Sequence, residues 1–200
     1  MSRFARPRLE SLTDGIFAFA MTVLVLDIRL PPDLPLSSSA DLTAHLLGLW
    51  PQTLTYIISF FVLGAHWRGV AEERPGTQAI TSGQVHLQLI YLFFVTLVPF
   101  SSSLVGKYGS LPPAVVFYAG NMIALGLLSI ALRHRDLPAA ERGSLRRVAG
   151  PHMPVFIASA AVSALLSLVA PQYAMLAYLL NILTRFPRRG GEPPAASATN

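Results

Sequence analysis

Long apolar runs are the feature of this sequence that most restricts its fold. A helix that crosses the hydrocarbon core of a bilayer needs about 20 mostly apolar residues. Runs of about this length, bounded by charge, proline or glycine, lie at Leu12–Ile28, Leu42–Gly64, Gly83–Val105 and Ala114–Leu132. A soluble domain of 200 residues has too little interior for a chain that is 52% hydrophobic and only 12% charged. We therefore predict an all-α membrane protein.

The last apolar stretch, Val155–Thr184, contains Ala170-Pro171-Gln172 near its middle. Proline interrupts a helix, so this stretch is predicted to form two short helices joined by a tight turn. Five or six crossings are then possible. Six are favoured by the positive charges, because cytoplasmic flanks of membrane helices are enriched in Lys and Arg.

With six spans and a cytoplasmic N-terminus, 13 of the 15 Lys and Arg residues fall on the cytoplasmic side, and only Arg29 and Lys107 fall outside. We predict a six-helix membrane domain over residues 1–186, in the cell membrane, with both termini cytoplasmic. A disordered tail is expected over Pro187–Asn200, and a Pro- and Ser-rich connection over Pro31–Ser39. A cleaved signal peptide is disfavoured because Asp14 lies at the start of the first apolar run.

Several functional classes lack the residues they need. The chain has no cysteine, and its five histidines show no metal-ligand spacing, so neither a metal site nor a cofactor is expected. Phosphate-binding and nucleophile-elbow motifs are absent from the sequence, so an enzyme is not expected. The basic residues form clusters between apolar runs, which does not favour nucleic acid as a partner. Val105-Gly106-Lys107-Tyr108-Gly109 is similar to the filter segment whose backbone carbonyls bind the ion in tetrameric potassium channels. A lysine interrupts the pattern, so we do not expect such a filter here.

Two charged residues, Asp14 and Asp27, fall within the predicted spans, and both belong to the first helix. A charge inside a membrane is costly, so each is a candidate for a functional or structural role. Asp14 could cap the helix or pair with Arg8 or with a neighbouring helix. Asp27 could be an interfacial residue or, if several copies surround an axis, part of an acidic ring that concentrates cations.

The first helix also carries a regular apolar seam. Its members are separated by 4, 3, 4, 3 and 4 residues: Leu12, Ile16, Phe19, Val23, Leu26 and Leu30. This 3.5-residue period favours association with like helices around a shared axis. Thr22 places a hydroxyl close to the same face, although an isolated threonine more often bonds to its own backbone carbonyl.

The first helix resembles that of the transmembrane protein 175 family, which comprises lysosomal potassium channels and their prokaryotic homologues. Arg8-Leu9-Glu10-Ser11-Leu12-Thr13-Asp14 is similar to the family signature Arg-x-x-x-Phe-Ser-Asp, with Leu12 and Thr13 in place of Phe and Ser. The likeness continues to Ile28 and includes Trp67 farther along. The family's usual histidine, one turn after this tryptophan, is missing here, where His66 precedes it instead.

This resemblance implies a homotetramer in which the first of six helices from each subunit lines a central pore. Phe19 is expected at the narrowest ring, Val23 and Leu26 at further apolar rings, and Thr22 at the position linked to potassium preference. Asp27 would enrich cations at the outer mouth, and Arg8, Thr13, Asp14 and Trp67 would be structural signature residues. The implied function is a potassium-permeable, modestly selective cation channel. The alternatives are a proton-coupled or other secondary transporter, for which no repeat is visible, and a membrane scaffold.

Overall fold

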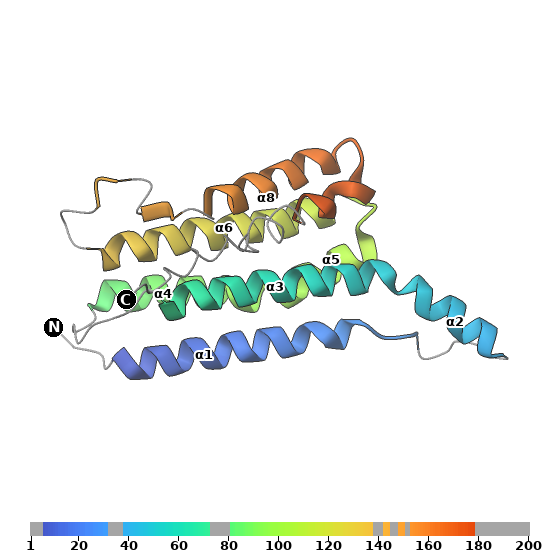
Figure 1. The fold of residues 1–200 in the computed structure, drawn as a ribbon, viewed down its shortest axis with the longest axis horizontal. Coiled ribbons are helices and arrows are strands. Elements are labelled where there is room, and N and C mark those ends of the chain that lie inside the picture. Colours follow the sequence, from blue (N-terminus) through green and yellow to red (C-terminus); the bar gives the residue numbers. More distant parts are fainter. Residues whose placement is uncertain are drawn as a thin grey trace, which may run out of the picture.

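The computed structural model describes residues 6–31, 38–72, 81–137, 142–144, 148–150 and 153–178. Regular structure in these ranges is helical throughout, so the prediction of an all-α protein is confirmed. The elements are α1 (Arg6–Val23), η1 (Leu24–Asp27), α2 (Ser39–Gly48), α3 (Trp50–Glu72), α4 (Ser82–Thr96), α5 (Val98–Tyr108), α6 (Pro112–Asp136), α8 (Met153–Ser167) and η2 (Pro171–Tyr178). Most of them lie lengthwise beside one another in an elongated bundle (Figure 1).

Four helices in the described ranges are long and apolar enough to cross a membrane. They are Arg6–Asp27, Trp50–Ala71, Ser82–Tyr108 and Pro112–Asp136. Each corresponds to one of the first four predicted spans. The third candidate includes a break between α4 and α5, where Pro99 is the second residue of α5. Leu97 keeps a right-handed helical backbone there, so this crossing is kinked rather than ended.

The predicted start of the second span at Leu42 is wrong. Leu42 belongs to α2, a separate helix that projects beyond the end of the bundle at an angle to α3 (Figure 1). The cause is Pro51, which has no backbone N–H and cannot continue a helix that comes from α2. As the second residue of α3 it is tolerated, because the first N–H groups of a helix have no partner within that helix.

The two ends of the bundle differ in the number of basic residues that they hold. One end gathers the start of α1, the end of α3, the start of α4 and the end of α6 (Figure 1). Arg135 near the end of α6 donates to the Gly83 carbonyl at the start of α4 at 2.9 Å. This end therefore holds the described basic residues of α1, α3 and α6, whereas Arg29 and Lys107 lie at the other end. For these described residues the grouping is the one predicted from the arginine counts, and which end faces the cytoplasm stays a prediction.

The last apolar stretch is shorter than a full crossing in the described residues. α8 has 15 residues, about 22 Å at 1.5 Å per residue, against a hydrocarbon core of roughly 30 Å. It is followed by a turn and then by η2, which is a 3-10 helix. The predicted pair of short elements joined at Ala170-Pro171 is therefore confirmed. The rest of the predicted sixth span and the tail from Pro187 lie outside the described residues, and so does most of the Pro31–Ser39 connection.

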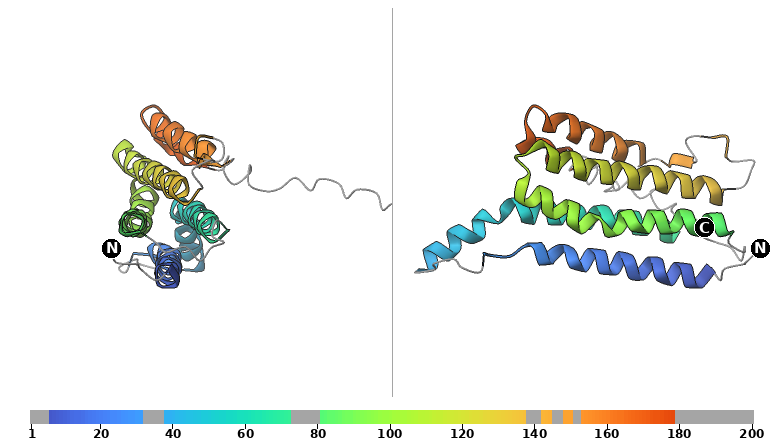
Figure 2. Two further views of the ribbon diagram at one scale, coloured as in Figure 1. Left: turned by 90° about the vertical axis from the view of Figure 1, so that its left-hand side faces the viewer. Right: turned by 180° about the vertical axis from the view of Figure 1, so that it is seen from behind.

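α6 lies centrally in the bundle, and α1 lies at one edge. In an end-on view α1 and α8 occupy opposite margins of the bundle, with α3 to α6 between them (Figure 2). Tyr91, Tyr118 and Phe156 are among the largest fully buried side chains of the core. Because α1 is at the edge, one of its faces contributes to this core and the other does not.

Candidate functional site on the first helix

The first helix has two faces that differ in burial. The residues that it buries against the bundle are Leu9, Thr13, Phe17, Ala20 and Leu24. The predicted seam adjoins this buried face. Its residues Leu12, Phe19 and Leu26 are exposed. Ile16, Val23 and Leu30 are half-buried, and Ile16 packs against the core. Phe19 and Leu26 are each 67% exposed. The exposed part of the seam, at Leu12, Phe19 and Leu26, is thus an apolar face of α1 that a single chain leaves open.

Exposed apolar side chains alone do not identify a functional face, because lipid-facing helices carry them too. Phe93 on α4 and Leu127 on α6 are 58% and 54% exposed. A threonine hydroxyl accompanies the exposed phenylalanine on both helices: Thr96 donates to the Phe93 carbonyl on α4 as Thr22 does to the Phe19 carbonyl on α1. Thr22 lies three residues after Phe19 and four before Leu26, which places its hydroxyl on the open face of α1.

The Thr22 hydroxyl donates to the Phe19 carbonyl oxygen at 2.8 Å and is exposed. This is the local hydrogen bond expected of an isolated threonine. The bond uses the hydroxyl proton and leaves the oxygen lone pairs free to accept. An oxygen that can only accept is a suitable ligand for a cation.

Asp14 is paired with a neighbouring helix. The indole Nε1 of Trp67 on α3 donates to Asp14 Oδ1 at 2.9 Å. α1 begins at Arg6, so Asp14 lies two turns inside the helix and does not cap it. The fold thus brings together two of the predicted signature residues, while Arg8 is exposed.

Thr13 faces the interior, where sequence reasoning missed its partner. Gln88 Nε2 on α4 donates to Thr13 Oγ1 at 3.1 Å, and Thr13 donates in turn to the Leu9 carbonyl at 2.8 Å. Both side chains are 1% exposed. A glutamine in an apolar run is the signal that could have found this contact, because a buried amide needs a polar partner. One turn further along α4, Tyr91 bonds to His66 Nδ1 at 3.2 Å.

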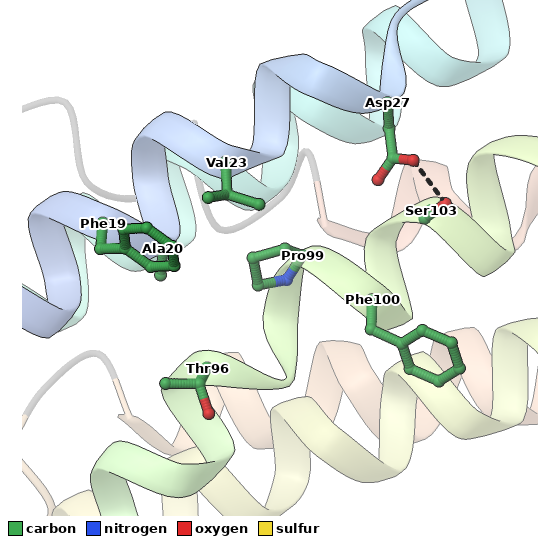
Figure 3. Close-up of a pocket in the computed structure, with 8 residues that line it drawn as sticks. All are labelled: Phe19, Ala20, Val23, Asp27, Thr96, Pro99, Phe100 and Ser103. Atoms are coloured by element: carbon green, nitrogen blue, oxygen red, sulfur yellow. Dashed lines mark hydrogen bonds between the residues drawn. The ribbon is translucent and has the colours of Figure 1, made fainter.

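Asp27 ends η1 and reaches across to α5. Ser103 Oγ donates to Asp27 Oδ1 at 2.8 Å (Figure 3). Lys107 Nζ lies 3.3 Å from the same oxygen and forms an ion pair with it. The predicted acidic residue is therefore present at this end of α1, but a lysine partly neutralises it. Neither Ser103 nor Lys107 was a predicted site residue.

A hollow of about 350 Å³ runs beside the open face of α1. It separates Phe19, Val23 and Asp27 of the first helix from the region of the α4–α5 kink (Figure 3). Its walls are mostly apolar, with Asp27 and Ser103 together at one end. Across the described ranges, no group of three or more His, Cys, Asp or Glu side chains is placed to hold a metal ion.

Comparisons with known proteins point to one family. The family model described as endosomal/lysosomal potassium channel TMEM175 matches residues 8–99. A potassium channel of Streptomyces collinus is 29% identical over 192 residues, which cover 87% of this chain and 91% of that relative. A potassium channel of Chamaesiphon minutus is 32% identical over 126 residues, covering 60% of this chain and 61% of that one.

The fold is similar to the crystal structure of a lysosomal potassium-selective channel TMEM175 homologue from Chamaesiphon minutus. The TM-score is 0.75 at 24% identity, with 88% of this chain and 94% of the other covered. The similarity of fold thus extends well beyond the residues that the family model matches.

Proposed function

The chain belongs to the TMEM175 family, and from that premise we propose that it is a potassium-permeable, modestly selective cation channel. The pore is lined by α1 from each of four identical subunits with six membrane helices each. One observation carries this proposal: Leu12, Phe19 and Leu26 of the 3.5-residue seam are left open by the subunit, whereas the face of α1 that carries Phe17 and Leu24 is buried. α1 also lies at the edge of the bundle, where copies can surround an axis (Figure 2).

The gate is the apolar part of the open face. Phe19, Val23 and Leu26 from the four subunits form successive hydrophobic rings, with Phe19 at the narrowest point. A narrow apolar ring expels water and so blocks ions until it widens or becomes wet. The high exposure of Phe19 and Leu26 in the single subunit supports this assignment.

Selectivity rests on Thr22. Its hydroxyl proton is donated to the Phe19 carbonyl, so the oxygen faces outward as an acceptor. Four such oxygens replace part of the hydration shell of a potassium ion. Because four hydroxyls offer fewer oxygens than stacked carbonyl rings, we expect modest preference for potassium over sodium.

Arg8, Thr13, Asp14 and Trp67 hold α1 in place rather than contact the ion. Thr13 and Asp14 are tied to α4 and α3 by hydrogen bonds to Gln88 and Trp67. Asp27 lies at the outer mouth. We place the protein in the cell membrane with both termini in the cytoplasm, which puts most of the basic residues on the cytoplasmic side. Potassium is the transported ion, and the channel uses neither a cofactor nor a catalytic residue.

Recording from the purified, reconstituted chain in planar bilayers tests the proposal. A channel gives unitary current steps in potassium chloride, with a reversal potential that follows the potassium gradient. A secondary transporter gives flux without steps, and a scaffold gives neither. Macroscopic flux without unitary steps would therefore favour the transporter alternative and overturn the channel.

A further inference from the structure

The ion pair between Asp27 and Lys107 lies at one end of the proposed pore helix. We propose that Lys107 sets the electrostatic charge of this pore entrance by neutralising Asp27, and so limits how fast cations enter there. The inference rests on the proposed channel function and deepens it. It assigns a role to a residue that lies outside α1, 80 positions along the chain.

The geometry fixes this pair in one arrangement. Ser103 and Lys107 are one turn apart on α5, and both donate to the same carboxylate oxygen, at 2.8 and 3.3 Å. Lys107 lies in the last turn of α5, where a cation also interacts favourably with the helix dipole. Water and salt still reach both groups, because the side chains of Lys107 and Asp27 are 36% and 29% exposed.

The pair lies at the level of the seam. Asp27 is one turn after Val23 and directly follows Leu26. A carboxylate at this position would attract cations to the entrance, and its repetition around the axis would make a ring of negative charge. With an ammonium group 3.3 Å away, the pair acts on an ion as a dipole, whose field falls off faster with distance than that of a single charge.

Arg29 at this entrance acts in the same direction as Lys107, whereas Asp41 in the first turn of α2 brings a negative charge to the same end of the bundle. Arg29 and Lys107 line a second hollow, of about 770 Å³, together with His45 of α2. Counting Arg29, Lys107 and Asp27, each subunit brings two positive charges and one negative charge to this end. Without the Lys107 charge, one positive and one negative charge remain in each subunit. Without the Asp27 charge, two positive charges remain.

Single-channel conductance of reconstituted protein tests the proposal at two salt concentrations. The Debye length is about 30 Å in 10 mM salt and about 3 Å in 1 M salt. The variants are Lys107→Gln, Asp27→Asn, the double variant Asp27→Asn/Lys107→Gln, and Lys107→Arg, which keeps the charge. Arg29→Gln is the matched control, because it removes a positive charge at the same end without releasing a carboxylate.

In low salt we expect Lys107→Gln to conduct at least about twofold more than wild type, because an unpaired carboxylate raises the local cation concentration. Asp27→Asn should conduct less than wild type, and the double variant and Lys107→Arg should be close to it. Arg29→Gln should raise conductance by less than Lys107→Gln. In high salt all these differences should disappear, because the charges are screened.

Three results would overturn the inference while leaving the channel intact. They are equal conductance of wild type and Lys107→Gln in low salt, equal increases in Lys107→Gln and Arg29→Gln, and a change that persists in high salt. The last would indicate that the pair only holds η1 in shape. If wild type itself gives no potassium current, the proposed function fails, and this inference fails with it.

Discussion

Trp67 donates its indole N–H to the Asp14 carboxylate at 2.9 Å, which ties α1, the proposed pore helix, to α3. The carboxylate that accepts this hydrogen bond belongs to α1, and the indole that donates it belongs to α3. An intramembrane carboxylate is costly unless it is paired, so the pair should help to fix the position of α1.

Trp67→Phe should therefore lower the stability of the folded protein in detergent. A hydrogen bond to a charged group contributes about 1.5 to 3 kcal/mol, and the exposure of Asp14 puts the expected loss at or below the low end of this range. Asp14→Asn keeps an acceptor oxygen and should lower the stability of the folded protein by less than Trp67→Phe does. Thermal unfolding followed by circular dichroism measures both. Trp50→Phe is the control for loss of an indole, because Trp50 is 62% exposed, and an equal loss there would contradict the prediction.

The sequence predicts those parts of the fold that are specified by residues close together in the chain. The four long spans follow from apolar runs, which a single segment displays by itself. The break before α3 was missed because the apolar run continues through Pro51, and only helix geometry decides that a proline there starts a new helix.

The candidate site likewise has a part that the local sequence predicts and a part that depends on distant residues. The 3.5-residue period predicted a seam, but nearly every residue of α1 is apolar, so the pattern could not show which face the bundle buries. Burial of Phe17 and exposure of Phe19 depend on α3 and α4. The partners of Thr13 and Asp27 lie 75 and 80 residues away along the chain, and nothing local to α1 specifies them.

Phe19→Ala should raise potassium current, because it removes the bulkiest side chain from the apolar ring that we propose as the narrowest. If the smaller side chain lowers the barrier by about 1.4 kcal/mol, the rate of ion passage rises about tenfold. Macroscopic current per channel in reconstituted bilayers measures the effect. Leu165→Ala on α8 is the matched control, since Leu165 is 66% exposed but lies on the helix farthest from α1. An equal increase in the two variants would count against the gate.

Thr22→Val should weaken the preference for potassium over sodium, because it removes the acceptor oxygen while keeping the branched shape. A neutral hydroxyl contributes on the order of 1 kcal/mol, so we expect about a fivefold loss in the permeability ratio. Reversal potentials with potassium on one side and sodium on the other measure that ratio. Thr22→Ser keeps the oxygen and should retain the preference. An unchanged reversal potential in Thr22→Val would exclude Thr22 as the selectivity residue.

Gly126→Ala should destabilise the packing of α6 against α8. An added Cβ at this glycine would lie 2.7 Å from Ile157 Cγ1 and 3.3 Å from Phe156 Cδ1. Overpacking of this kind costs about 1 to 3 kcal/mol. Gly120→Ala in the same helix meets nothing within 4 Å, so it should be neutral or stabilise α6 by up to about 1 kcal/mol. Thermal unfolding in detergent compares the two variants. The prediction fails if both unfold at the same temperature as wild type.

Leu26→Cys should form a disulfide between subunits, because the proposed assembly places copies of α1 around one axis. The wild-type chain contains no cysteine, so between copies of this chain the new thiol can pair only with its counterpart. Leu26 is 67% exposed in the single subunit, whereas Leu24, two residues earlier, is 2% exposed and packs inside the bundle. Under mild oxidation in membranes, non-reducing gels should show a covalent dimer for Leu26→Cys and a monomer for Leu24→Cys. Dimers in neither variant would mean that copies of α1 do not come within disulfide distance at Leu26, which contradicts the expected close packing around the axis.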